Sequence, residues 1–405
     1  MIDPRDYGPD NLPFGIVSDG TDRRRPAVAY GDQVIDLDAL VGRKLLDAES
    51  LRGATVLNGF LAAGLMTWRA VRARLQHLLG PSASSDERAG VAACMLPHAA
   101  VTVHVPVAIG DYVDFYSSLE HATNLGRILR PNSEPLLPNY RHIPIGYHGR
   151  AGTVVVSGTP IRRPHGQRLA AGASAPEFAP SALLDVELEM GWFAGPGNAL
   201  GELILADAVR EHVFGYVLLN DWSARDIQAW EYQPLGPFLG KSFATSISPW
   251  IVTLDALEPF RVPEPVRDPE PLPYLRAAES WAYDLELELL LQTPRMREHG
   301  DDAVSVSRTS FRAMYWTVAQ QLAHVTSNGA TIRPGDLFGT GTISGSEQGT
   351  QGSFIELTSR GAMRLTLPNG ETRAFLEDGD AVILRGRALR GDARIGLGEV
   401  TGTIV

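Results

Sequence analysis

Cysteine is almost absent from the sequence: the only one among 405 residues is Cys94. A single thiol excludes an internal disulfide framework and a zinc site built from cysteines. Basic residues are not in excess either, since the formal net charge is -11, which argues against a nucleic-acid partner. No stretch approaches the roughly 18 apolar residues that a membrane helix needs, and the start shows no signal peptide. We therefore expect a cytoplasmic protein with neither a membrane nor a nucleic-acid partner.

Two motifs of catalytic and nucleotide-binding proteins are also missing. The nucleophile-elbow pattern G-x-S-x-G does not occur, which weakens a serine-hydrolase interpretation of Ser117 and Ser118. The segment 236–242 resembles a phosphate-binding loop, but Gly236 and Gly240 enclose one residue fewer than that motif requires. We exclude nucleotide binding on this ground. Lys241, in a tight apolar loop, remains a candidate for stabilising an anion.

The order of strand and helix patterns predicts a mainly β protein with some helix (α+β) in two domains. Residues 1–108 form the first expected unit, with two short strands around the turn at Gly31-Asp32 and a helix at 55–79. Residues 109–405 form the second unit, a β-roll or barrel of many short strands. Its expected elements include strands at 183–190, 213–220 and 353–357, a hairpin around 367–371 and a helix at 310–326.

The stretch Asp185-Val186-Glu187-Leu188-Glu189-Met190 is the most informative segment. Acidic and apolar residues alternate with the period of a β-strand, so the three acids are expected on one face. Same-face neighbours are only about 7 Å apart. Carboxylates that close repel one another unless they are protonated or share a cation. On this pattern alone, the segment is either a solvated strand face or part of a metal site.

Two further clusters hold polar residues beside expected strand ends. Asp221, Arg225 and Gln228 have the spacing of one helical face, which fits a cation or substrate site, or a surface ion pair at a helix start. The segment 114–121 contributes His121, whose imidazole can act as a general base near neutral pH, although a lone histidine is more often structural. The clusters together supply an all-oxygen set that suits Mg²⁺ or Ca²⁺: Asp114, Glu187, Glu189 and Asp221.

Several long motifs resemble the fumarylacetoacetase family. They are 111–124 (DYVDFYSSLEHATN), 144–150 (PIGYHGR), 157–164 (SGTPIRRP), 184–190 (LDVELEM), 220–228 (NDWSARDIQ), 236–243 (GPFLGKSF) and 341–346 (GTISGS), and the match extends to NLPFG at 11–15. The resemblance implies an N-terminal SH3-like barrel, a C-terminal β-roll and a homodimer. It also implies metal-dependent hydrolysis of the carbon–carbon bond of 4-fumarylacetoacetate, an acidic β-diketone, to fumarate and acetoacetate, the last step of tyrosine and phenylalanine breakdown.

The resemblance also implies a role for each matching position. Ca²⁺ or Mg²⁺ would be held by Asp114, Glu187, Glu189 and Asp221, without Asp185, and a second metal-linked site would involve Lys241 and Thr245. His121 would be the general base and Glu356 would orient it. Negative charge at the reacting centre would be stabilised by Arg225, Gln228 and Lys241. The substrate would be contacted by Tyr116, Arg130, Tyr147, Gln228, Tyr232 and Thr342.

Two other functions stay open on the sequence. Shorter relatives of this fold catalyse acylpyruvate hydrolysis, oxaloacetate decarboxylation or dienoate isomerisation, and the N-terminal unit together with the motif at 114–121 favours fumarylacetoacetate hydrolysis over these. A non-catalytic metal-binding scaffold would need the carboxylates but not His121, Glu356 and Lys241 together.

Overall fold

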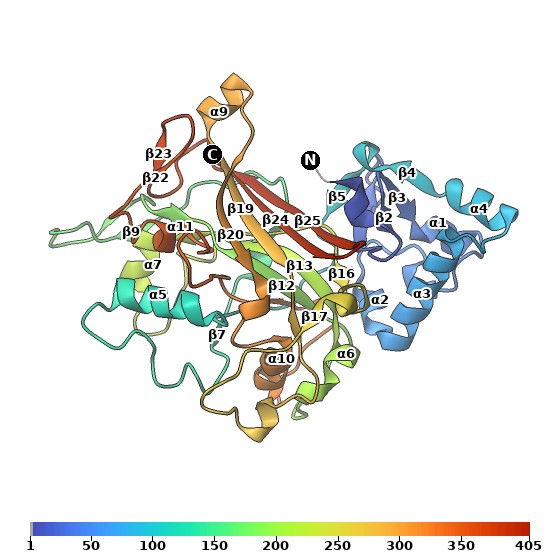
Figure 1. The fold of residues 1–405 in the computed structure, drawn as a ribbon, viewed down its shortest axis with the longest axis horizontal. Helices are drawn as coiled ribbons and strands as arrows, with labels where there is room; N and C mark the ends of the chain where they lie inside the picture. The colour runs from blue at the N-terminus through green and yellow to red at the C-terminus, as the bar shows by residue number, and fades with distance from the viewer. Residues whose placement is uncertain (1–2) are drawn as a thin grey trace.

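A five-stranded antiparallel sheet forms the N-terminal part of the protein in the computed structural model, which describes residues 3–405 (Figure 1). Its order is β4-β3-β2-β1-β5, with β1 Phe14–Ser18, β2 Arg25–Tyr30, β3 Gln33–Asp36, β4 Met95–Pro97 and β5 Thr102–His104. The predicted hairpin around Gly31-Asp32 is the β2–β3 pair. Between β3 and β4 lie four helices: α1 Leu37–Gly42, α2 Asn58–Ala62, α3 Gly64–Leu79 and α4 Ser85–Ala92.

An eight-stranded sheet forms the centre of the larger, C-terminal part. Its order is β7-β6-β21-β12-β13-β15-β8, with β16 beside β13. The strands are β6 Tyr112–Phe115, β7 Gly146–His148, β8 Val154–Val156, β12 Leu188–Ala194, β13 Val213–Asp221, β15 Thr245–Ile247, β16 Val252–Thr253 and β21 Leu337–Gly339. Every residue of β12 and β13 is buried, because both faces of this sheet are covered by other elements.

A second, four-stranded sheet packs beside it, in the order β20-β19-β24-β25. Its strands are β19 Glu286–Gln292, β20 Val304–Ser310, β24 Ala381–Arg390 and β25 Ala393–Thr403. Short two-stranded pairs complete the β-structure: β9 His165–Arg168 with β10 Glu177–Pro180, β11 Leu184–Asp185 with β14 Ser223–Ala224, β17 Arg261–Val262 with β18 Ala282–Tyr283, and β22 Leu365–Thr366 with β23 Thr372–Arg373. The last pair is the hairpin expected around 367–371.

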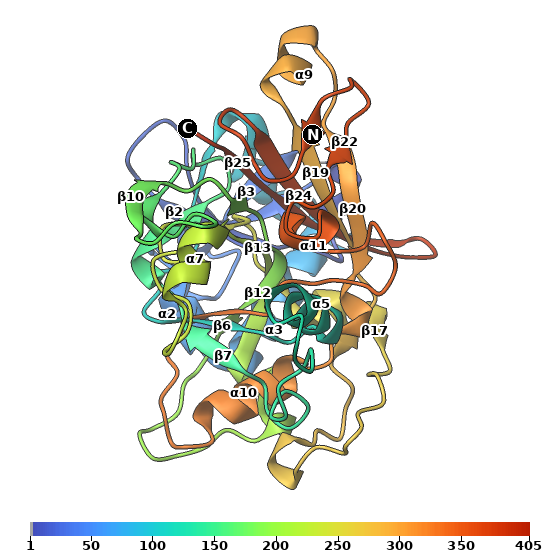
Figure 2. The same cartoon turned by 90° about the vertical axis from the view of Figure 1, so that its left-hand side faces the viewer.

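Helices of the C-terminal part cover the sheets and carry polar residues to one side of the molecule. They are α5 Leu119–Leu129, α6 Val209–His212, α7 Arg225–Glu231, α8 Leu254–Leu257, α9 Pro294–His299, α10 Val318–Thr326 and α11 Phe354–Leu357. Figure 2 shows α5, α7 and α11 on the same side, around the ends of β12 and β13. The mixed α+β fold with predominant sheet structure agrees with the fold class expected from the sequence. No helix among residues 3–405 is long and apolar enough to cross a membrane.

Four helix and strand predictions were wrong or incomplete. The expected strand at 183–190 is interrupted, because residues 186–187 lie between β11 and β12. The expected helix at 55–79 is two helices, because Gly64, the first residue of α3, has φ +80° and interrupts the helical backbone. Only 318–326 of the expected helix at 310–326 is α-helical, since Ser310 ends β20, which pairs with β19, and 311–313 form a short 3-10 helix. The segment 353–357, expected as a strand, contains the short helix α11.

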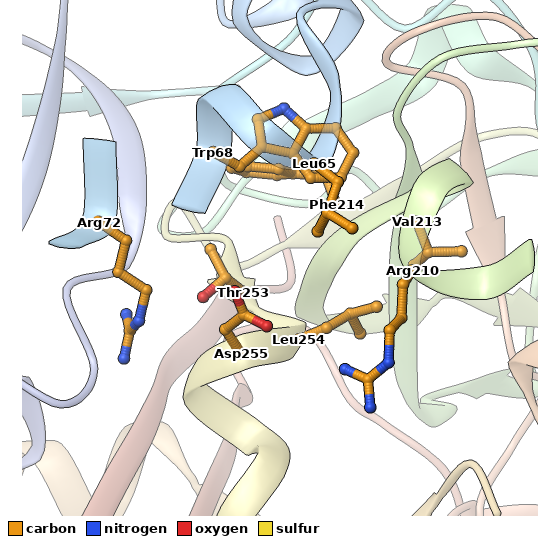
Figure 3. A pocket seen from close by; sticks show the side chains of 9 residues that line it. All are labelled: Leu65, Trp68, Arg72, Arg210, Val213, Phe214, Thr253, Leu254 and Asp255. Carbon is orange, nitrogen blue, oxygen red and sulfur yellow. The ribbon is translucent and has the colours of Figure 1, made fainter. Parts of the chain in front are cut away.

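The N-terminal part packs directly on the central sheet through aromatic residues. Phe214 of β13 lies 5.2 Å from Trp68, 5.6 Å from Phe14 and 5.7 Å from Phe60, as measured between ring centroids. Figure 3 shows a small pocket at this contact, with Trp68 and Leu65 of α3 beside Phe214. The two parts therefore share one apolar core. The domain boundary at 108/109 stays a prediction.

Candidate active site

A cavity of about 410 Å³ opens between α5, α7, β7 and the loops that follow α5 and α7. Most of the residues implied by the resemblance line it: Asp114, Tyr116, His121, Arg130, Tyr147, Glu187, Arg225, Gln228, Tyr232, Lys241 and Thr342. The rest contact this set from behind: Glu189, Asp221, Thr245 and Glu356. The fold thus brings the whole predicted set together from distant segments, with His121 and Glu356 in contact although 235 residues separate them in the chain.

Three carboxylates meet at the inner end of the cavity. Asp114, Glu187 and Glu189 each offer an oxygen, and these oxygens all lie within 4.8 Å of one another. Strand pairing creates the cluster, because β21 runs between β6 and β12 and places Gly339 opposite Asp114. A Cβ atom on Gly339 would lie 2.6 Å from Asp114 Oδ1 and 3.0 Å from Glu189 Oε2. Glycine at this position therefore allows the two acids to approach across the strand.

Burial makes this acidic cluster unfavourable without a cation. Desolvation, together with the neighbouring carboxylates, raises the pKa of Asp114 and of Glu189 well above the usual range. Asp114 Oδ1 and Glu189 Oε1 are buried and have no hydrogen-bond partner among the described residues. Ordinary buried polar atoms are paired, so these two oxygens fit a divalent cation. The alternative of a solvated strand face for 185–190 was wrong, because Asp185, Glu187 and Glu189 are all buried.

Two buried cations flank the acids. Lys241 Nζ contacts Glu187 Oε2 and lies 3.0 Å from Asp221 Oδ2. Arg225 Nη2 lies 2.8 Å from Glu187 Oε1. Burial alone would raise the pKa of Glu187, but Lys241 and Arg225 lower it below its ordinary value, so this carboxylate is ionised. The surface ion pair between Asp221 and Arg225 that the spacing allowed is absent among the described residues, because Asp221 ends β13 and pairs with Lys241 instead.

Asp221 is held by three donors. Besides Lys241, it accepts hydrogen bonds from Tyr147 Oη at 2.7 Å and from Thr245 Oγ1 at 2.9 Å. Tyr147, Lys241 and Thr245 were all expected near substrate or metal, and the structure connects them through this one acid. The Tyr147 hydroxyl hydrogen is engaged here, so toward a bound molecule it has only acceptor capacity left.

His121 and Glu356 form a buried pair beside the cluster. His121 Nδ1 lies 2.7 Å from Glu356 Oε2, which also accepts hydrogen bonds from Ser344 at 2.9 Å and Ser353 at 2.7 Å. Asn124 donates to the other carboxylate oxygen at 3.0 Å. Burial alone would raise the pKa of Glu356, but His121 and these donors lower it. An ionised Glu356 can only accept a hydrogen bond, so Nδ1 of His121 carries the hydrogen and donates it. In the neutral ring, Nε2 is then the basic nitrogen.

The two serines that precede His121 have structural roles. Ser117 is fully buried, and its Oγ accepts a hydrogen bond from Gln321 at 2.9 Å. Ser118 caps α5, since its Oγ accepts from the amide of His121 at 3.3 Å. Neither serine lines the cavity. This geometry removes the serine-hydrolase interpretation.

The outer end of the cavity carries donors beside an apolar wall. The rings of Tyr116 and His121 meet edge to face, with centroids 5.3 Å apart. Arg130 Nη2 donates to the carbonyl of Pro135 at 2.9 Å, whereas its Nε is buried without a partner among the described residues. Thr342 Oγ1 is likewise buried and without a described partner. The apolar wall is formed by Leu125, Leu129, Leu136, Leu137, Leu235 and Pro237.

Sequence reasoning missed the residues that support Glu356. Asn124, Ser344 and Ser353 donate to its carboxylate, but each comes from a different segment and none belongs to a periodic pattern. Asn124 and Ser344 lie within motifs quoted above, so the resemblance marked their segments without marking their function. Asp185 was expected to contribute no metal ligand, and its contacts with Arg225 and α11 had no signal in the sequence.

One cavity combines a histidine held by an ionised carboxylate, an acidic cluster that fits a divalent cation, and two buried cations. This combination defines a hydrolytic enzyme of the β-roll class. Residues 112–405 match the family model described as fumarylacetoacetate hydrolase, C-terminal, and residues 10–106 match fumarylacetoacetase, N-terminal. The chain therefore belongs to the fumarylacetoacetase family.

Curated relatives extend the match over the full length. The chain is 46% identical to the fumarylacetoacetase of Rattus norvegicus over 412 residues, which covers 100% of this chain and 97% of the relative. It is 48% identical to that of Arabidopsis thaliana over 404 residues, covering 98% and 94%. Among solved structures, the fumarylacetoacetate hydrolase from Exiguobacterium antarcticum has a TM-score of 0.54 at 18% identity, covering 97% of this chain and 99% of that one. The last match supports the fold alone.

Proposed function

We propose that this protein hydrolyses the carbon–carbon bond of 4-fumarylacetoacetate, giving fumarate and acetoacetate in the last step of tyrosine and phenylalanine breakdown. The observation that carries the proposal is the His121–Glu356 pair in the same cavity as Arg225, Lys241 and the acidic cluster, in a chain that matches fumarylacetoacetases from end to end. We also propose a homodimer in the cytoplasm, as the family resemblance implies.

His121 acts as the general base in this proposal. Glu356 holds Nδ1 protonated at 2.7 Å and fixes the ring, so Nε2 takes the proton of a water molecule in the cavity. The water oxygen attacks the ketone carbon next to the fumaryl double bond. The carbon–carbon bond then breaks, and its electron pair leaves with acetoacetate as an enolate, which is protonated. A β-diketone suits this chemistry because its leaving carbanion is stabilised by the second carbonyl group.

Negative charge on the reacting oxygens is stabilised by preorganised donors. Arg225 Nη2 is buried 2.8 Å from Glu187 Oε1 and carries two hydrogens, so one remains for an oxyanion. Gln228 accepts from Arg225 Nη1 through its Oε1 at 3.2 Å, which leaves its amide nitrogen available as a donor. Lys241 stays protonated, since Asp221 and Glu187 raise its pKa against the effect of burial. Donors fixed in a buried site lower the barrier without reorganisation.

A divalent cation would be held by four carboxylates: Asp114, Glu187, Glu189 and Asp221. When bound, Ca²⁺ or Mg²⁺ supplies a Lewis acid for the two carbonyl oxygens of the diketone. The unpartnered oxygens of Asp114 and Glu189 support this assignment. All-oxygen donor sets favour these hard cations. We propose that the second metal-linked site involves Lys241 and Thr245, both of which contact Asp221.

The substrate carboxylates are recognised by Tyr116, Arg130, Tyr232, Thr342 and Gln228 in this proposal. Tyr147 contacts the substrate in the same cavity but not as a donor, because its hydroxyl hydrogen is bonded to Asp221. Arg130 has an unpartnered Nε at the cavity, which suits a charge-assisted hydrogen bond to a carboxylate.

The test is the loss of fumarylacetoacetate absorbance with purified protein, with acetylpyruvate as the comparison substrate. We expect kcat/KM for fumarylacetoacetate to exceed that for acetylpyruvate by at least about 10², since losing a carboxylate partner of a buried cation costs about 2–5 kcal/mol. Comparable efficiency on acetylpyruvate would assign the protein to acylpyruvate hydrolysis instead.

A further inference from the structure

Asp185 lies directly behind the cavity and has no part in the function proposed above. Its side chain is fully buried and does not line the cavity. Oδ1 accepts hydrogen bonds from the amides of Val186 at 2.8 Å and Phe354 at 2.7 Å. Oδ2 accepts from the amide of Ile355 at 3.1 Å and from Nε of Arg225 at 2.8 Å. Each oxygen thus has two donors, which distinguishes this acid from Asp114 and its unpartnered oxygen.

Three of these hydrogen bonds join two elements that carry different parts of the catalytic machinery. Arg225 begins α7, and Phe354 and Ile355 form the start of α11. The next residue of α11 is Glu356, the partner of His121. The Asp185 carboxylate therefore binds both Arg225, which stabilises charge, and the backbone of α11, which carries Glu356.

The orientation of the Arg225 guanidinium depends on this contact. Arg225 donates a hydrogen bond from Nε to Asp185 and another from Nη1 to Gln228, the latter at 3.2 Å. Nη2 lies 2.8 Å from Glu187 Oε1 and carries two hydrogens, so at least one of them is not directed at that oxygen. A guanidinium is planar, so fixing Nε and Nη1 also fixes the direction of the Nη2 hydrogens.

We propose that Asp185 is a positioning residue for the reaction: it acts through Arg225 and α11, and sets the donor that faces the developing oxyanion relative to the general base. This inference rests on the proposed function. Arg225 binds charge that grows toward the transition state, so loss of its positioning lowers kcat much more than it raises KM.

Asp380 provides a matched control for a buried acid paired with arginine. It is fully buried, lies 2.9 Å from Nε and 3.1 Å from Nη2 of Arg373, and accepts from the amide of Glu377 at 2.9 Å. It does not line the cavity. Asp185→Asn and Asp380→Asn therefore remove the same charge from similar surroundings, and only the first touches Arg225.

The experiment measures kcat, KM and melting temperature for both variants with fumarylacetoacetate, and Ca²⁺ affinity by calorimetry. We expect both variants to lose thermal stability. We expect kcat of Asp185→Asn to fall by about 10² or more, with KM and Ca²⁺ affinity changed by less than about threefold, and kcat of Asp380→Asn to stay within about twofold of wild type. Equal kcat values for the two variants would overturn the inference.

Two further variants show whether Asp185 acts through Arg225. Adding Asp185→Asn to Arg225→Met should lower kcat by much less than the same change does in the wild-type protein, because only the contacts with α11 remain to be lost. A fully multiplicative loss would overturn the inference. Asp185→Glu keeps the charge for folding but displaces the guanidinium, and a wild-type kcat for that variant would also contradict it. An inactive wild-type protein would reject the proposed function itself, and is distinguishable from these outcomes.

Discussion

At the scale of single residues, His121 has the clearest expected effect. His121→Ala removes the base whose Nδ1 is held by Glu356 at 2.7 Å, and turnover should fall by about 10² or more. Folding and cation binding should persist, as measured by circular dichroism and calorimetry. Ser117→Ala is the control: it loses a buried hydrogen bond to Gln321, so it should lower stability by about 1 kcal/mol and leave turnover largely intact. An inactive Ser117→Ala beside an active His121→Ala would restore the serine mechanism.

Arg130 determines substrate choice at the same scale. Its unpartnered Nε is expected to recognise a substrate carboxylate, so Arg130→Met should remove most of the preference for fumarylacetoacetate over acetylpyruvate. The measurement is the ratio of the two kcat/KM values for wild type and variant. Arg127→Met serves as the control, since Arg127 lies in α5, which ends one residue before Arg130, but does not line the cavity. An unchanged ratio in Arg130→Met would place the carboxylate elsewhere.

At the scale of elements, strand β21 makes the acidic cluster possible. Gly339→Ala would place a Cβ atom 2.6 Å from Asp114 Oδ1 and 3.0 Å from Glu189 Oε2. Because the Asp114 carboxylate must move, we expect calorimetry to show at least about tenfold weaker Ca²⁺ binding. Disturbing the surroundings of a metal ligand typically lowers metal affinity by this factor or more. Gly152→Ala, where a Cβ would meet nothing within 4 Å, should bind Ca²⁺ like wild type. Equal affinities for the two variants would remove Asp114 and Glu189 from the proposed ligand set.

The same elements show what could be predicted from the sequence. The alternation at 185–190 indicated the acidic cluster, and β13 lies where the strand at 213–220 was expected. The strand expected at 183–190 is interrupted at 186–187, between β11 and β12. The segment 353–357 was predicted as a strand but contains the short helix α11. The first amides of this helix donate to Asp185, which lies 169 and 170 residues earlier in the chain. The segment 304–310 is a strand because β19 pairs with it. Local sequence patterns do not indicate partners that are distant in the chain. For the same reason, the contacts of Asn124 and Ser344 with Glu356 were not predicted.

The residue roles came from a different source than the elements. From spacing alone, Asp221 could be either a ligand or a helix cap, and His121 could be either a general base or a structural histidine. Motif resemblance assigned a role to each, and the structure brings all of these side chains to one cavity or directly behind it. The roles themselves stay predictions until activity and cation binding are measured.

At the scale of the whole molecule, cation binding should be linked to global stability. Burial and neighbouring carboxylates raise the pKa of Asp114 and of Glu189, so a bound cation offsets a desolvation and repulsion that the unfolded chain lacks. Ligand that binds only the folded state adds about 2.7 kcal/mol at a hundredfold excess over Kd. The melting temperature should therefore rise with Ca²⁺ or Mg²⁺ concentration. A melting temperature that is insensitive to either cation at millimolar concentration would argue against the site.

The most direct test of the central claim is the loss of fumarylacetoacetate absorbance before and after exhaustive chelation, with residual metal measured by mass spectrometry. The account predicts hydrolysis to fumarate and acetoacetate by the untreated protein, loss of activity with the cation and recovery on adding Ca²⁺ or Mg²⁺. Full hydrolysis by protein whose metal content is near zero would contradict it.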